Sequence, residues 1–245
     1  GDKEMAWEYA DKMIRGIHEE HKWFPFVTQE EVAATEKEDR IFQSEILFGL
    51  YNLKRKENVY SVGFGPNLKQ GSVLRIDKDI MNEMYEGDEN DFRLAYWFSD
   101  MVDPDNNSYT HMIKYMDVDD LDTKTEISKG YTYIMPVLRV SEVYLIAAEC
   151  CPDPKVGRDY LNAVRSVRNV KNVADEVDLT TVIEQEFRRE FLGEGQLFWL
   201  YKRKGKAEII SGETQGKVVS MEERFYLFDL PQSERDYREE NGIGN

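Results

Sequence analysis

The sequence predicts a mainly α-helical protein, in which amphipathic helices pair as hairpins beside a smaller, loop-rich lobe that contains short strands. Apolar residues recur at helical spacing throughout a central segment at about 135–205. Glycine, proline and asparagine concentrate instead in the lobe, at about 51–133, with short apolar runs between them. With 245 residues, the chain is long enough for one large domain or two lobes.

The central segment predicts three successive helices. Pro136 stands just before the first, where its missing N–H costs little. The third is expected to begin with a capping box, made by Thr180 or Thr181 with Glu184, and glycines follow its end. The apolar residues that share one face in each helix are Val140, Val143, Tyr144 and Ala147, then Tyr160, Leu161, Val164 and Val167, then Ile183, Phe187 and Phe191.

Small residues at the seam of the first two helices, Ala147, Ala148 and Ala163, favour close packing as in tetratricopeptide-like helical hairpins. The opposite faces are charged. These charges are expected to form an ion-pair lattice that fixes helix register, without a catalytic role. The lattice would join Arg165, Arg168, Arg188 and Arg189 to Glu142, Glu149, Glu186 and Glu190.

The first residues predict a helix at 4–20, whose apolar pattern suits the second half of a hairpin with its first half upstream. His18 and His21 lie one turn apart near its end. A zinc site would need further ligands and the HExxH spacing is absent, so a solvated helix end without metal is expected.

Shorter elements are expected on either side of the central helices. Residues 35–50 predict a helix or a strand, 72–86 a helix, and 60–71 a loop without regular structure. The acidic run at 117–122 lacks the glycine and closing glutamate of an EF-hand, so it predicts a solvated loop and no calcium site. The remaining expectations are strand residues at 92–101, 115 and 131–134, a linker at 207–216, and a short strand within 218–230.

The composition excludes several classes of protein. A net charge of −16 argues against a nucleic-acid partner, because phosphates repel such a surface. The chain has no apolar run near the length of a membrane span, and it begins with neither a signal peptide nor a lipid-modified cysteine segment. Cys150 and Cys151 are adjacent and would point apart on a helix, so free thiols are expected.

No motif predicts catalysis. The glycines at 63, 65 and 71 lack the Lys-Ser/Thr pair of a phosphate-binding loop, and no G-x-S-x-G elbow occurs. A glycosidase pair is defined by the separation of two carboxylates in space, which a sequence does not give. The chain is therefore expected to bind a ligand without chemistry, with no catalytic residue, cofactor or metal.

Several stretches form an ordered set of motifs along the chain. They read NDFRLAYWF at 90–98, then PVLRVSEVYLIAAE, LNAVRSVR and IEQEFRREFLGEGQLFWLYKRKG in the central segment, then FYLFDLPQSERDYREENGI at 225–243. In this order they resemble the SusD/RagB family of outer-membrane nutrient-binding lipoproteins. Their shared order is a stronger signal than any one motif. The resemblance assigns residues 1–245 to the C-terminal portion of a SusD/RagB-like domain.

The resemblance implies capture of a glycan or oligosaccharide at the outer face of the cell outer membrane, and its delivery to a SusC-like TonB-dependent transporter. It also implies a lipid anchor on an N-terminal part missing from this chain, and a C-terminal tail that packs over the helical lobe. Phe198 and Trp199 are expected in the core. A peptide- or protein-binding helical repeat and an unrecognised hydrolase remain as alternatives.

Aromatic rings in turn-rich segments are the candidates for ligand contact, because the C–H face of a sugar stacks on an aromatic face. The predicted ligand-binding residues are Tyr60, Phe64, Tyr96 and Trp97. On a strand, Tyr96 and Trp97 would point to opposite faces, so that only one of them is core. Trp23 and Tyr109 are further candidates.

Overall fold

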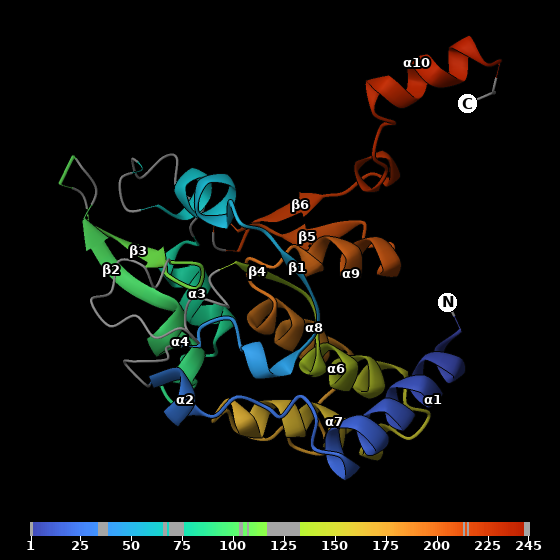
Figure 1. Cartoon of the computed structure of the whole chain (residues 1–245). Helices are drawn as coiled ribbons and strands as arrows, with labels where there is room; N and C mark the ends of the chain where they lie inside the picture. Colours follow the sequence, from blue (N-terminus) through green and yellow to red (C-terminus); the bar gives the residue numbers. More distant parts are fainter. Residues whose placement is uncertain are drawn as a thin grey trace.

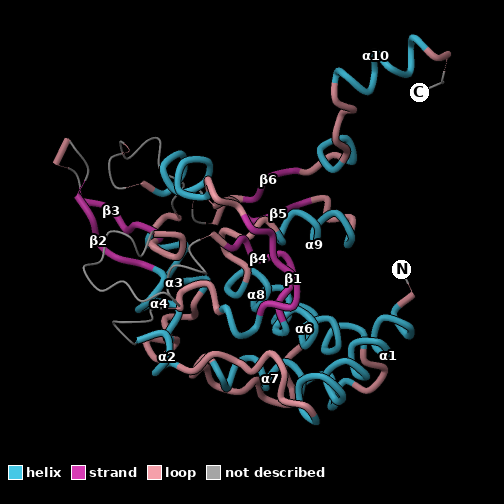
Figure 2. The backbone as a smooth tube through the Cα atoms, viewed as in Figure 1, coloured by secondary structure: helices cyan, strands magenta, loops and turns pink. Residues whose placement is uncertain are grey.

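Helices predominate in the computed structural model of the chain, as the sequence predicts (Figure 1, Figure 2). The structure describes residues 2–33, 39–65, 68, 76–102, 105–106, 108–116, 133–212, 214 and 216–242. The α-helices are α1 (Lys3–Met13), α2 (Gln29–Ala33), α3 (Lys78–Met84), α4 (Phe92–Trp97), α6 (Val140–Cys150), α7 (Pro154–Val167), α8 (Leu179–Glu190), α9 (Gln196–Lys204) and α10 (Gln232–Glu240). Wider or tighter turns form η1 (Ile14–Glu20), η2 (Gln43–Glu45), η3 (Lys56–Phe64) and η6 (Glu223–Tyr226).

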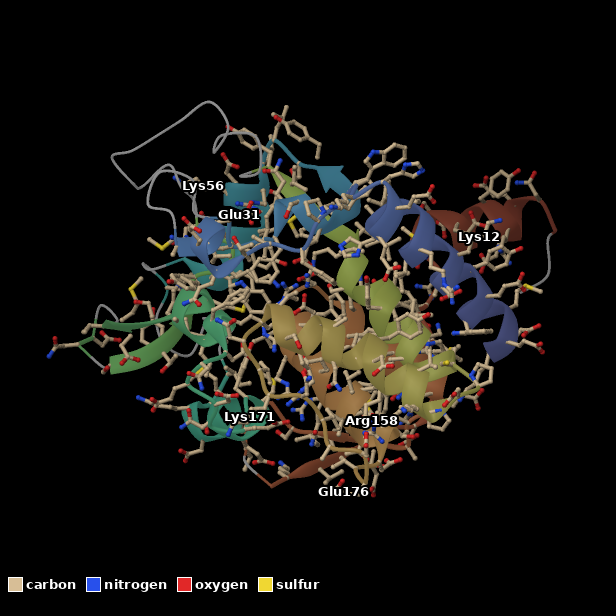
Figure 3. The ribbon with its side chains drawn as sticks, turned by 90° about the horizontal axis from the view of Figure 1, so that it is seen from below. Lys12, Glu31, Lys56, Arg158, Lys171 and Glu176 are labelled. Carbon is tan, nitrogen blue, oxygen red and sulfur yellow. The ribbon has the colours of Figure 1, made fainter. Side chains whose placement is uncertain are left out.

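Helix α6 is the centre of the fold, and it packs against α1, α7 and α8 (Figure 3). The predicted close seam is confirmed at Gly157 of α7, where an added Cβ would lie 2.9 Å from the carbonyl oxygen of Ala148. The three central helices are confirmed too, with two changes at their starts. Pro136 lies in a strand, so α6 begins only at Val140, and Asp178 caps α8 in place of the predicted threonine.

The strands form three small antiparallel pairs. β1 (Ile46–Tyr51) pairs with β4 (Ile134–Arg139), with Gly49 opposite Pro136. β2 (Phe98–Val102) pairs with β3 (Ser108–Met112), and β5 (Glu208–Ile210) pairs with β6 (Val218–Ser220). The tight β1–β4 contact explains the glycine at 49, since an added Cβ there would meet the Ile134 side chain at 2.9 Å.

Three predictions in the loop-rich segment are wrong. Residues 92–97 form a helix in place of a strand, because the Asp91 side chain accepts the N–H of Arg93 and caps the turn. Residues 60–64 belong to the helical η3 in place of a loop. Tyr115 is a turn residue buried after β3 and not a strand residue. The predicted acidic loop at 117–122 lies outside the described residues.

The buried apolar side chains form two clusters. One gathers side chains of α1, α6, α7, α8 and α9. The other gathers η3, α3, α4, β3 and the segment around Phe42. Fully buried charged side chains, described below, connect the elements of the two clusters.

The chain after β6 leaves the body of the molecule (Figure 1). None of the residues of α10 is buried, which corrects the expectation that this tail packs over the helices. Within the described residues, none of the helices has the length and apolarity needed to cross a membrane.

Candidate functional site

Three of the four predicted ligand-binding rings are core residues. Trp97 has no exposed surface, and its indole N–H donates to the carbonyl oxygen of Arg40 at 2.8 Å. The ring stacks on Phe42, with centroids 5.0 Å apart, and the ammonium of Lys114 lies 3.8 Å from its centroid. With its edge and its face engaged by protein, this indole has no surface to offer a ligand. The expectation that Trp97 stacks on a sugar conflicts with this burial.

The other predicted rings lie close to Trp97 in the same apolar cluster. Tyr60 and Phe64, on η3, are buried, and the Phe64 ring packs on Tyr115 with centroids 5.6 Å apart. Their burial conflicts with a role in stacking. Tyr96 is half-buried and retains accessible surface. It precedes Trp97 on α4, so the argument from opposite strand faces does not apply. Ligand contact by Tyr96 stays a prediction.

Trp23 is the candidate indole that the fold displays. It is 58% exposed, although a tryptophan normally contributes most of its surface to a core. The imidazole of His21 stacks on it, with centroids 4.8 Å apart and planes 22° apart. We call this pair, His21 and Trp23, the Trp23 platform. One face of the indole is covered by the imidazole, which leaves the opposite face for a flat ligand.

The backbone beneath the Trp23 platform is unusual in two ways. Residues Ile14–Glu20 form a wide helical turn, and the N–H of Trp23 donates to the carbonyl oxygen of Ile17 at 3.0 Å. Lys22 and Phe24, on either side of the tryptophan, both have a φ of 54°. Each left-handed residue that is not glycine costs about 1–2 kcal/mol, and such strain gathers at functional sites. The chain therefore carries strain to hold a ring that burial does not stabilise.

A second exposed indole lies on α9. Trp199 is 53% exposed, which corrects the expectation that it is core, and it packs against Phe228 with centroids 5.9 Å apart. The ammonium of Lys202 lies 5.6 Å from the Trp199 centroid and 5.8 Å from that of Phe228. We call these three residues the Trp199 patch. Phe198 packs behind both rings.

The charged side chains of the central helices form a buried network around Glu190. Its carboxylate accepts from Arg168 at 2.7 Å, from Arg139 at 2.5 Å and from Arg93 at 2.8 Å. Burial alone would raise the pKa of Glu190, but these guanidinium groups hold the pKa well below its ordinary value. The group is therefore ionised throughout the physiological range and permanently paired.

The network confirms most of the predicted lattice. Arg165 and Arg189 pair with Glu186, and Arg168 pairs with Glu190. Arg188 and Glu142 are the exceptions, since both are half-buried and neither has an ion-pair partner among the described residues. Glu149 pairs with Arg203 of α9. The partners that the prediction missed come from distant segments, and they are Glu45, Glu86, Asp91, Arg93, Lys114, Arg139 and Glu194.

His18, His21 and a cleft lie outside the buried network. Nδ1 of His18 lies 2.7 Å from the Tyr144 hydroxyl, and His21 belongs to the Trp23 platform. No three His, Cys, Asp or Glu side chains gather as a metal site in the part of the chain that is described. A cleft of about 780 Å³ lies between the ends of α1, α6, α8 and α9. It is lined without an aromatic ring, and its Arg203 and Lys206 are paired with Glu149 and Glu184.

Comparison with known proteins assigns the chain to a family. A profile of the SusD family matches residues 3–238. The chain belongs to the SusD family. No functionally curated protein matches it significantly.

Solved structures share the fold of this SusD-family chain. A SusD superfamily protein from Bacteroides thetaiotaomicron superposes with a TM-score of 0.68 at 23% identity, over 96% of this chain and 55% of that one. A SusD-like carbohydrate binding protein from Bacteroides vulgatus gives a TM-score of 0.64 at 16% identity, over 97% and 55%. A SusD superfamily protein from Parabacteroides distasonis gives 0.61 at 15%, over 96% and 56%. The chain thus spans about half the length of these structures.

Four of the five stretches that resemble the SusD family contribute residues to the buried network. NDFR supplies Asp91 and Arg93, and PVLR supplies Arg139. LNAVRSVR supplies Arg165 and Arg168, while EQEFRRE supplies Glu186, Arg189 and Glu190. Most of these stretches therefore build the scaffold, but they are not confined to it, because the exposed Trp199 lies within one of them. Trp23 lies outside all of them.

Proposed function

We propose that this SusD-family chain takes part in capturing a glycan or oligosaccharide at the outer face of the cell outer membrane. In this proposal a lipid anchor holds the whole protein, and the ligand passes unchanged to a SusC-like TonB-dependent transporter. Membership of the family supports the proposal, as does the likeness to a structure described as a carbohydrate binding protein. The division into a loop-rich lobe at about 51–133 and central helices at about 135–205 is part of the same proposal.

The observation that carries the proposal is the Trp23 platform. An exposed indole with one face open offers the surface on which the C–H face of a sugar ring stacks, and its strained backbone holds it in place. The adjacent imidazole of His21 supplies a polar group at the edge of the stack for a hydroxyl. Binding at this platform needs no chemical step.

Catalysis has less support in the geometry. The carboxylates of Glu186 and Glu190 are held by cations in the buried network and have no exposed side-chain surface. A buried, permanently paired carboxylate cannot meet a glycosidic bond or a water molecule. We therefore infer a binding role, and turnover on a glycan panel would contradict it.

The test compares the Trp23→Ala variant with a matched control, Trp199→Ala. The two side chains are 58% and 53% exposed. Calorimetric titration with a glycan panel should show binding by the unaltered protein. Loss of one stacking ring should weaken it by about tenfold or more, since a stacked ring contributes about 1–3 kcal/mol by analogy with nucleobases. Trp199→Ala should leave affinity unchanged, and circular dichroism should show both variants folded.

Two results would contradict the proposal. Trp23→Ala that folds and binds every glycan normally would remove the platform from the site. Binding of a peptide pool, with no response to any glycan, would favour the alternative of a peptide-binding helical module.

A further inference from the structure

The Trp199 patch exposes two aromatic rings beside a lysine. Trp199 and Phe228 are 53% and 69% exposed and lie against each other. Lys202 bridges the two rings and has no carboxylate partner among the described residues. Exposed aromatic rings next to an unpaired cation have the composition of an interaction hot spot. The chain carries this cation despite a net charge of −16.

Helix α10 has the complementary composition. None of its residues is buried, and Tyr237 is 56% exposed. Residues three apart on a helix share a face, so Glu234 and Glu240 flank that tyrosine. Glu234 is paired with Arg238 at 2.9 Å, whereas Glu240 has no ion-pair partner within the described chain. One face of α10 therefore presents an aromatic ring and a free carboxylate.

We propose that α10 of one chain docks on the Trp199 patch of a second copy of the chain. The Tyr237 ring packs on Trp199 and Phe228, and the Glu240 carboxylate pairs with the ammonium of Lys202. Ring packing and a charge pair then occur together, which gives the contact both stability and register. A second copy fits this contact because Lys202 and Glu240 lack ion-pair partners among the described residues and carry opposite charges.

The path of the chain points to a second copy. Residues 229–231 alone separate Phe228 from α10, and they carry the helix away from the body (Figure 1). Within one chain, the helix and the patch therefore do not meet. When two chains each donate a helix to the other, the two contacts are related by a twofold axis and the assembly closes as a dimer.

The experiment measures self-association of the full chain by sedimentation velocity over a concentration series. We expect a reversible dimer. Tyr237→Ala and Trp199→Ala should each weaken the dimer, raising its dissociation constant by more than about tenfold. Lys202→Glu should weaken it too, and so should Glu240→Lys. The double variant Lys202→Glu/Glu240→Lys should recover the dimer, because the reversed charges pair again. Lys12→Glu, on the exposed side of α1 (Figure 3), is the control that should leave the dimer intact.

Three outcomes would overturn the inference. The chain could stay monomeric across the series. It could dimerise with no response to Tyr237→Ala or Trp199→Ala. Finally, a monomer in which Tyr237→Ala changes the Trp199 fluorescence would show that the helix folds back on its own patch. Circular dichroism on each variant keeps loss of folding distinct from loss of association.

Discussion

Adjacent residues of the central helices differ sharply in what surrounds them. Arg189 has no exposed side-chain surface and reaches Glu86 at 3.0 Å and Glu186 at 3.2 Å. Arg188, the next residue, is half-buried and has no ion pair among the described residues. A buried carboxylate that loses its cation keeps the cost of desolvation without the compensating attraction. The contribution of each arginine to the free energy of unfolding thus depends on its burial and its partners.

We predict that Arg189→Ala lowers the free energy of unfolding by about 3–5 kcal/mol. Arg188→Ala should change it by less than about 0.5 kcal/mol, as at ordinary surface positions. Urea denaturation of the two variants measures both. Equal losses would mean that the burial of the network contributes little.

A second residue-scale prediction concerns Glu142, whose burial raises its pKa to about 7. The folded state then binds a proton that the unfolded state releases near its ordinary value of 4.5. Stability from this group is complete below about pH 4.5 and is lost as the pH rises to 7, by up to ~3 kcal/mol. Glu142→Gln removes this titration. Its free energy of unfolding should therefore rise relative to that of the unaltered protein as the pH increases from 4.5 to 7.5. A constant difference in unfolding free energy would contradict the assignment.

At the scale of elements, α6 and α7 approach each other closely at Gly157. The missing side chain of Gly157 leaves room for the Ala148 carbonyl, which an added Cβ would meet at 2.9 Å. Gly157→Ala should therefore destabilise the protein by about 1–3 kcal/mol despite the better helix propensity of alanine. Gly16→Ala is the matched control, because nothing lies within 4 Å of its added Cβ. Thermal unfolding of both variants decides the point, and equal melting temperatures would refute the steric argument.

Elements could be predicted where their signal is local. Helices α6, α7 and α8 follow from apolar spacing within their own sequence, and that spacing survives in the structure. The six-residue helix at 92–97 is too short for periodicity, and its only local signal is the cap at Asp91. Exposure is different, because it depends on what covers a residue from elsewhere. The sequence therefore predicts ligand contact at Trp97 and burial of Trp199, whereas Trp97 is buried and Trp199 is exposed. The ion pair between Glu45 and Arg168 joins residues far apart in the chain, and no local pattern predicts it.

At the scale of the whole molecule, surface and interior respond differently to salt. With a net charge of −16, acidic side chains at the surface repel one another, and dissolved ions screen that repulsion. The network around Glu190 is shielded from ions by burial. Added sodium chloride should therefore raise the melting temperature of the unaltered protein, while the loss caused by Arg168→Ala, whose partners Glu45 and Glu190 are fully buried, stays constant. Calorimetry at low and moderate salt tests this, and a loss that shrinks with salt would show that the network is open to solvent.

The position of Glu190 also determines whether the chain can be divided. Its carboxylate lies on α8, yet it is held by Arg93 of α4 and by Arg139 at the end of β4. A cut in the backbone near residue 133 would separate Glu45 from Arg139 and Arg168, and Lys114 from Glu194. Each fragment would then have to bury charges without counterions or leave its core open to water. Neither fragment alone should fold, whereas the two produced together should reassemble, each supplying the ions that the other lacks.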